Sequence, residues 1–173
     1  MKKIINFLLV FYYLFSFSVV ALEYNSNAPL KFDSEIVAGQ LDNGLTYYVY
    51  ENDEPEDVAY LRLVIRAGSL QEDVDQQGLA HFVEHMAFNG SANFDFGEII
   101  NFLESIGMEY GPHLNASTGY DKTIYKLKIP TDDPVIIKKG MLVLADFAGE
   151  VRFKEQDFEN ERKVVVSSVS VTK

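Results

Sequence analysis

The segment that decides the fold is Gly78–Gly90, which has the sequence GLAHFVEHMAFNG. It contains two of the three histidines in the chain, His81 and His85, and Glu84 directly precedes the second. Most of the surrounding residues are apolar, which is typical of a buried helix. On a helix, positions i and i+4 share a face, so both imidazoles can point at one ion, and Glu84 faces the same side.

This arrangement of side chains suits a zinc site with an adjacent base. Neutral imidazole nitrogens are preferred zinc ligands. A carboxylate that is not itself coordinated can take a proton from a zinc-bound water, which is the role predicted for Glu84. The order His-x-x-Glu-His is the inverzincin signature. The five-residue pattern alone leaves open a chance pair of histidines, or core histidines with ordinary hydrogen bonds.

Length and composition narrow the possible functions. The chain has 173 residues, enough for one domain or for part of a larger one. A net charge of −11 disfavours nucleic acid as a partner. The absence of cysteine excludes disulfides, thiolate zinc sites and cysteine nucleophiles, so any metal must bind His, Asp or Glu.

The N-terminus has the features of a secretory signal. Lys2 and Lys3 precede an apolar run, and Val19 and Ala21 are small residues before a cleavage point after Ala21. We therefore expect a signal peptide at residues 1–21 and a periplasmic or secreted mature chain. The alternative is an uncleaved anchor in the inner membrane. No later segment is long and apolar enough to span a bilayer, so we expect no stable membrane span after cleavage.

Residues 22–33 are expected to form a leader, and regular structure should begin with a hairpin at residues 34–52, turning at Asn43-Gly44. A strand is predicted over residues 57–69. The histidine helix should begin near Gln76 or Gln77 and end at Asn89-Gly90.

A second helix is predicted over residues 94–107, two strands around Gly119, and a third helix after an N-cap at Asp132 or Asp133. A charged helix should follow, but its tail, residues 164–171, is rich in Val and Ser and is a poor helix former. The order of elements predicts an α+β fold with an antiparallel sheet backed by helices.

The chain resembles the pitrilysin/insulinase family of zinc metallopeptidases. The resemblance lies in AGSLQEDVDQQGLAHFVEHMAFNGS, and it continues through FLESIGMEYGPHLNASTGYDKTIYKLKIP to FENERKVVV. It implies that residues 34–173 are a truncated N-terminal metallopeptidase domain of this type, which hydrolyses peptide bonds with Zn²⁺ as cofactor. His81 and His85 would be the first two zinc ligands, and Glu84 the general base.

The resemblance also implies a place for the substrate. The residues NAST, 115–118, match the family's edge strand, to which a peptide or unfolded polypeptide adds as a further strand. Asn115 is therefore a candidate for substrate binding, with a turn residue as the alternative. His113 is expected to be merely exposed. Family enzymes close on the peptide with a second homologous domain or subunit, which would be the partner of this chain.

The family's third zinc ligand is a glutamate seven residues after the glutamate of a Glu-Arg pair. Here the pair is Glu161-Arg162, and the seventh residue after Glu161 is Ser168, a poor ligand. Glu161 is the tentative replacement as third ligand; otherwise it supports the site without binding metal. A site with only two histidines should bind zinc weakly. The alternative function is therefore a catalytically impaired fragment, or a non-catalytic homologue that binds peptides or a partner.

Overall fold

The structure is a computed structural model that describes the backbone of residues 32–171 and the side chains of residues 32–166. The predicted signal peptide, residues 1–21, and nearly all of the leader, residues 22–33, lie outside the described residues. The chain forms two compact units, residues 1–51 and 52–173. None of the described helices is both long and apolar enough to cross a membrane.

The first unit contains an antiparallel hairpin, as the sequence predicts. Strand β1 (Val37–Gln40) pairs with β2 (Thr46–Val49), with Gln40 opposite Thr46. In the connecting turn Gly44 has φ of 88°, a left-handed conformation that glycine adopts without steric cost. The Asn43 side chain accepts a hydrogen bond from the Leu45 backbone (3.1 Å), which fixes the turn from within.

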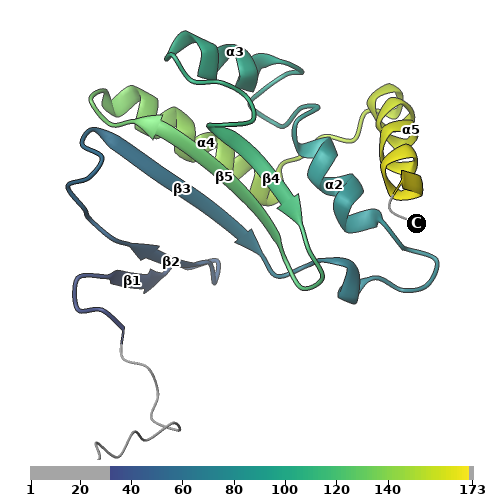
Figure 1. Cartoon of the computed structure of the whole chain (residues 1–173), viewed down its shortest axis with the longest axis horizontal. Coiled ribbons are helices and arrows are strands. Elements are labelled where there is room, and N and C mark those ends of the chain that lie inside the picture. Colours follow the sequence, from purple (N-terminus) through teal and green to yellow (C-terminus); the bar gives the residue numbers. More distant parts are fainter. Residues whose placement is uncertain (1–31, 172–173) are drawn as a thin grey trace, which may run out of the picture. The chain divides into compact units, whose positions relative to one another are not determined.

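The second unit is built on a three-stranded antiparallel sheet with the order β3–β5–β4 (Figure 1). Its strands are β3 (Val58–Ile65), β4 (Leu114–Thr118) and β5 (Thr123–Pro130). Its helices are the short 3₁₀ helix η1 (Ser69–Gln71), α2 (Leu79–Ala87), α3 (Glu98–Ser105), α4 (Pro134–Gly149) and α5 (Glu155–Val171). The predicted α+β class, with an antiparallel sheet and helices, is confirmed.

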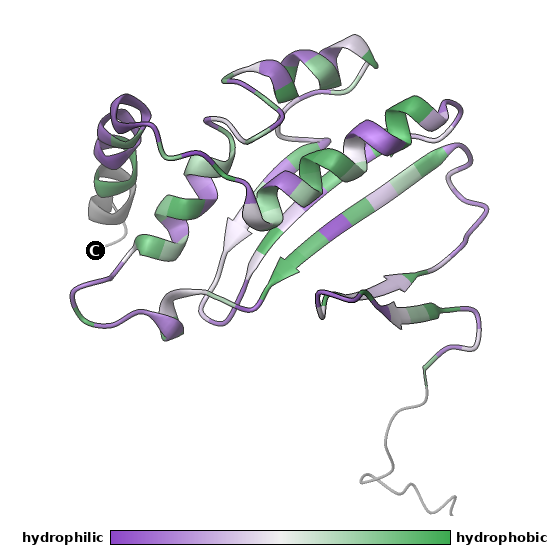
Figure 2. Ribbon diagram, turned by 180° about the vertical axis from the view of Figure 1, so that it is seen from behind, coloured by the Kyte–Doolittle hydropathy of each residue, from purple (hydrophilic) through white to green (hydrophobic). Residues whose placement is uncertain are grey.

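Helix α4 covers one face of this sheet, and Figures 1 and 2 show it from opposite sides. Alternate residues of β5 are buried beneath it, including Leu127 and Ile129, and α4 contributes Val143 and Phe147 to the same core. Gly140 allows the close approach, because a Cβ at this position would stand 2.7 Å from the Ile129 Cδ1 atom. The predicted N-cap is Asp133, whose side chain accepts from the Val135 backbone (2.8 Å).

Three predictions about the helices are wrong. Helix α3 begins at Glu98 rather than at residue 94, because Gly97 adopts a left-handed conformation (φ 80°). Helix α2 begins at Leu79 rather than near Gln76 or Gln77, because Gly78 adopts a left-handed conformation (φ 92°) that interrupts the helix there. Helix α5 continues to Val171 through the Val-rich tail. Tertiary packing overrides the low helix propensity, since Val165 is buried against Phe82 of α2.

Candidate metal centre

Helix α2 carries the histidine pair, and the preceding loop fixes where the helix starts. The Glu72 carboxylate accepts hydrogen bonds from the backbone of Gly78 and of Ala80, both at 2.8 Å. A carboxylate is favourable at a helix N-terminus, where free N–H groups and the helix dipole meet it. The loop is anchored in turn, because Leu70 donates its backbone N–H to the Tyr120 carbonyl (2.8 Å). Glu72 therefore sets the register of the histidine helix.

The two histidines meet as the sequence predicts. The Nε2 atoms of His81 and His85 are 3.1 Å apart, and the rings meet edge to face. Two zinc-bound nitrogens, each about 2.0–2.1 Å from a tetrahedral ion, would stand roughly 3.3 Å apart. The pair therefore fits two ligands of one zinc ion. Among the described residues, no group of three or more His, Asp or Glu side chains converges into a metal site.

Glu161 of α5 contacts the other ring nitrogen of His85. Its Oε1 atom lies 2.6 Å from His85 Nδ1, on the side of the ring that faces away from His81. A neutral His85 that donates from Nδ1 keeps a lone pair on Nε2, which is the form that binds a metal. The arrangement is the one by which carboxylates orient metal-binding histidines in other proteins.

Asn89 completes this contact and was not identified from the sequence. Its Nδ2 atom donates to Glu161 Oε2 (3.1 Å) and to the His85 carbonyl (3.3 Å). Both oxygens of the Glu161 carboxylate are thereby held: Oε1 by His85 of α2 and Oε2 by Asn89, which follows α2. The spacing of Asn89, four residues after His85, was the only sequence signal, and its partner lies 72 residues further on.

Glu84 is buried beside the histidines, with 8% of its surface exposed. Its Oε2 atom accepts a 2.5 Å hydrogen bond from the Thr118 hydroxyl at the end of β4. Thr123 on β5 donates to the Ala67 carbonyl (2.9 Å), and the two threonine hydroxyls are 3.4 Å apart. The sheet therefore holds the carboxylate through Thr118, a residue whose role no local pattern could reveal.

Tyr110 lies near the carboxylates of Glu84 and Glu161. Its ring packs edge to face against Phe88, with the ring centres 5.7 Å apart. Burial raises the pKa of the Tyr110 phenol, and the negative charges of Glu84 and Glu161 raise it further. Tyr110 therefore lies within electrostatic reach of both carboxylates.

The remaining candidates lie in different places. Asn115 is exposed on β4, and its side chain accepts from the next backbone N–H, that of Ala116 (2.8 Å). His113 is partly buried, and its Nδ1 atom accepts from the Glu109 backbone (3.0 Å), so the expectation of a merely exposed residue is too simple. Position 168 lies within α5, but the Ser168 side chain lies outside the described ones.

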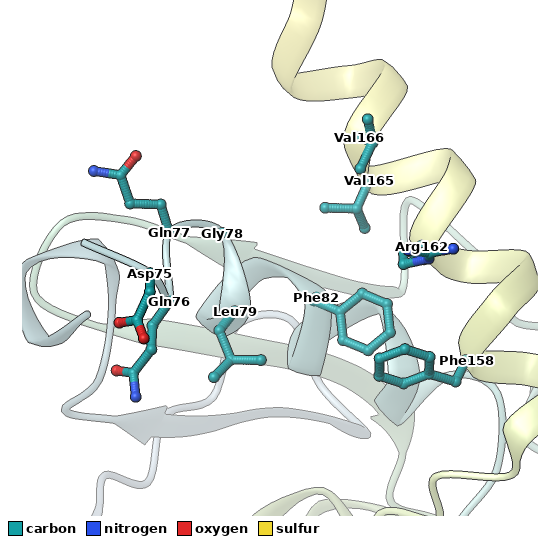
Figure 3. Close-up of a pocket in the computed structure, with 10 residues that line it drawn as sticks. All are labelled: Asp75, Gln76, Gln77, Gly78, Leu79, Phe82, Phe158, Arg162, Val165 and Val166. Atoms are coloured by element: carbon teal, nitrogen blue, oxygen red, sulfur yellow. The ribbon is translucent and has the colours of Figure 1, made fainter. Parts of the chain in front are cut away.

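A separate hollow lies between the start of α2 and the middle of α5. It has a volume of about 380 Å³ and is lined by Leu79, Phe82, Phe158, Arg162 and Val165 among others. Figure 3 shows the rings of Phe82 and Phe158 next to each other; they meet edge to face, with their centres 4.7 Å apart. None of the histidines and no candidate base lines this hollow. It marks the packing of two helices rather than the chemistry.

Known proteins resemble the chain over most of its length. A profile of the insulinase family, peptidase family M16, matches residues 47–173. The probable zinc protease PqqL of Haemophilus influenzae is 42% identical over 156 residues, which are 88% of this chain and 17% of that protein. A PQQL-like zinc protease of Arabidopsis thaliana is 45% identical over 128 residues, 74% of this chain and 13% of that protein.

A solved structure shows the same arrangement of elements. The first half of the periplasmic protease PqqL from Escherichia coli matches with a TM-score of 0.78 and 36% identity, over 83% of this chain and 31% of that one. The chain spans less than a fifth of the two curated relatives.

Proposed function

Because the chain belongs to the insulinase family of peptidases, peptidase family M16, we propose that it carries the metal-binding histidines and the general base of a zinc-dependent endopeptidase. One observation carries this proposal above the others. The Nε2 atoms of His81 and His85 face each other at 3.1 Å, and the buried Glu84 carboxylate is on the same helix.

His81 and His85 would hold the zinc ion through their Nε2 atoms. When bound, zinc would supply Lewis acidity, which polarises the scissile carbonyl and makes water a stronger acid. Glu161 would orient His85 through Nδ1 and leave Nε2 free for the ion. The third protein ligand would come from further along α5, where the family resemblance indicates position 168. A serine there supplies no good ligand, so we expect weak zinc binding in this chain.

Glu84 would act as the general base. Its carboxylate takes a proton from the attacking water, and the water oxygen then forms a bond to the carbonyl carbon of the substrate. Glu84 next delivers the proton to the departing nitrogen as the C–N bond breaks. The Thr118 hydroxyl holds one oxygen of this carboxylate at 2.5 Å, which leaves the other oxygen for the proton transfer.

The substrate would be a peptide or an unfolded polypeptide. Strand β4 pairs only with β5 among the described strands, so its other edge offers backbone groups to an added strand. Asn115 on β4 would then contact the substrate. We place the mature chain in the periplasm and expect a second homologous domain or subunit to close over the peptide. Residues 34–173 would belong to the N-terminal metallopeptidase domain.

A second function is favoured by one observation. Glu161 contacts His85 through Nδ1 and not through the Nε2 atom that faces His81, and within the described part of the chain no group of three possible ligands converges. If zinc does not bind usefully, the chain would be an impaired fragment, or a homologue that binds peptides or a partner without cutting them. The two functions share the sheet edge and differ in metal binding and turnover.

The experiment uses the mature chain, residues 22–173, with zinc content and cleavage of an unfolded, internally quenched peptide measured together. Glu84→Gln should leave zinc bound and lower turnover by roughly 10²–10⁴-fold, because a general base is lost and no ligand is removed. His81→Ala should abolish zinc binding. His113→Ala is the control, since that histidine makes a local backbone contact outside the pair. Cleavage that survives Glu84→Gln would contradict the assignment of the base.

A further inference from the structure

The face of the sheet opposite α4 carries a group of cations, and Figure 1 looks onto this face. Arg62 of β3 stands opposite Lys126 of β5, and Lys126 stands opposite Asn115 of β4. Lys128 follows two residues after Lys126 and therefore points to the same side. Arg62 and Lys126 are exposed. Leu127, which lies between the two lysines of β5, points to the other face and is fully buried. Arg62, Lys126 and Lys128 are called the cationic face below.

Within residues 32–166, no acidic side chain pairs with the cationic face. Strands β3, β4 and β5 contain no aspartate or glutamate, although the chain has 26 acidic residues. None of the three cations forms an ion pair with a carboxylate of the described residues. The contacts that these cations make are weaker than ion pairs. Arg62 donates to the Leu61 carbonyl (2.9 Å), and Lys128 lies 5.4 Å from the centre of the Tyr60 ring.

The arrangement is unfavourable in the free protein. Like charges directly opposite on neighbouring strands repel each other, and Arg62 and Lys126 form such a pair. The exposed Tyr60 and Val64 on the same strand present apolar surface beside the charges. An anionic ligand with some apolar surface would relieve the repulsion and cover these side chains, so the face is complementary to such a ligand.

We propose that the cationic face binds acidic segments of polypeptide in extended conformation. Resting on the proposed function, these segments would belong to the substrate, because the row Arg62–Lys126–Asn115 leads across the sheet to the free edge of β4. A polypeptide is favoured over nucleic acid, because an extended polypeptide can pair with the β4 edge through its backbone and a nucleic acid cannot.

The spacing of the cations specifies the acidic pattern. Lys126 and Lys128 are two residues apart on one strand, which is about 6.6 Å. Alternate side chains of an extended peptide have the same spacing and lie on one side of it. The preferred segment therefore has Glu or Asp at alternate positions, with the intervening residues free to vary.

The test measures binding without cleavage. A fluorescent peptide with glutamate at alternate positions is titrated with metal-free chain carrying Glu84→Gln, and anisotropy is followed at low and moderate ionic strength. Substitution of the cationic face by glutamine (Arg62→Gln, Lys126→Gln, Lys128→Gln) should weaken binding by roughly tenfold and remove most of its salt dependence. Lys126→Gln alone and Lys138→Gln on α4 form a matched pair, because each removes one exposed lysine, and neither lysine forms an ion pair among the described residues.

Several outcomes would overturn the proposal. The first is that the parent chain and the chain with the substituted cationic face bind the acidic peptide equally tightly. The second is that Lys138→Gln weakens binding as much as substitution of the cationic face does. The third is that a lysine-containing peptide or an oligonucleotide binds as tightly as the acidic peptide. Because the assay needs neither zinc nor turnover, an inactive chain that binds the acidic peptide supports this proposal and fails only the proposed function. An active chain that binds acidic and neutral peptides alike fails only this proposal.

Discussion

Glu161→Gln tests how the α5 carboxylate serves the histidine pair. In the structure Glu161 contacts His85 Nδ1 at 2.6 Å, while His85 Nε2 faces His81. Glutamine retains an oxygen that can accept from Nδ1 but loses the negative charge. If Glu161 acts only through His85, the substitution weakens the metal site without removing a ligand. If Glu161 instead binds the ion directly, the substitution removes one.

The two roles predict different magnitudes in two backgrounds. Loss of a carboxylate that orients a metal-binding histidine costs about 10–100-fold in metal affinity, or about 1.4–2.7 kcal/mol. Position 168 lies seven residues after Glu161 in α5, about 10 Å along the helix axis. Ser168→Glu should itself raise zinc affinity by supplying the third ligand. If Glu161 only orients His85, Glu161→Gln should lower zinc affinity by the same factor with and without Ser168→Glu, because the two substitutions act on different ligands.

The assay is competition for zinc with a chromophoric chelator, applied to the parent chain, both single variants and the double variant. Additive effects, within about 0.5 kcal/mol, support the orienting role. A large loss in the parent chain that disappears when Ser168→Glu is present would refute it, since a new ligand would then be replacing Glu161 itself. Unchanged affinity on Ser168→Glu would refute the assignment of position 168.

Three further predictions follow from other contacts. Asn89→Ala should lower zinc affinity by roughly tenfold in the parent chain and have no further effect beside Glu161→Gln, because Asn89 acts by holding Glu161. Gly140→Ala should reduce the free energy of unfolding in urea by about 1–3 kcal/mol, since its Cβ would stand 2.7 Å from Ile129 Cδ1; Gly149→Ala, with no atom nearby, is the control. The hydrogen bond from Arg152 holds the pKa of Asp95 below its ordinary value, so this contact stabilises the fold at neutral pH and is lost as the pH falls through the lowered pKa. The stability difference between parent and Arg152→Gln should therefore be smaller at pH 3 than at pH 7, and a difference that grows in acid would contradict this.

Local chemistry was enough to predict much of the fold. Asn43-Gly44 predicted a hairpin turn because glycine accepts the left-handed conformation that the turn requires. The second strand predicted around Gly119 is β5, where Tyr125, Leu127 and Ile129 occupy alternate positions and share a buried core with residues of α4. The i, i+4 spacing of the histidines predicted a shared point for both rings, because helix geometry alone sets that relation.

What the sequence did not predict depends on contacts between distant segments. The Val-rich part of α5 is helical because Val165 is buried with Phe82 and Met86 of α2, and no propensity scale contains that contact. The hydrogen bond from Thr118 to Glu84 joins β4 to α2 across 34 residues. Such partners become visible only when the sheet and the helices are placed together.

The packing of α5 connects these two findings. An apolar contact between Phe82 and Phe158 and a polar contact between His85 and Glu161 join the same two helices. The polar contact requires the present position of α5 along its axis, because only there does Glu161 reach Nδ1 of His85 rather than Nε2. A slide of α5 that brought Glu161 to the metal would break the bond to Asn89 and displace Val165 from its buried position. We therefore expect Glu161 to act through His85 rather than as a ligand, and we expect zinc affinity to depend on the residue at position 168, where the family resemblance places the third ligand.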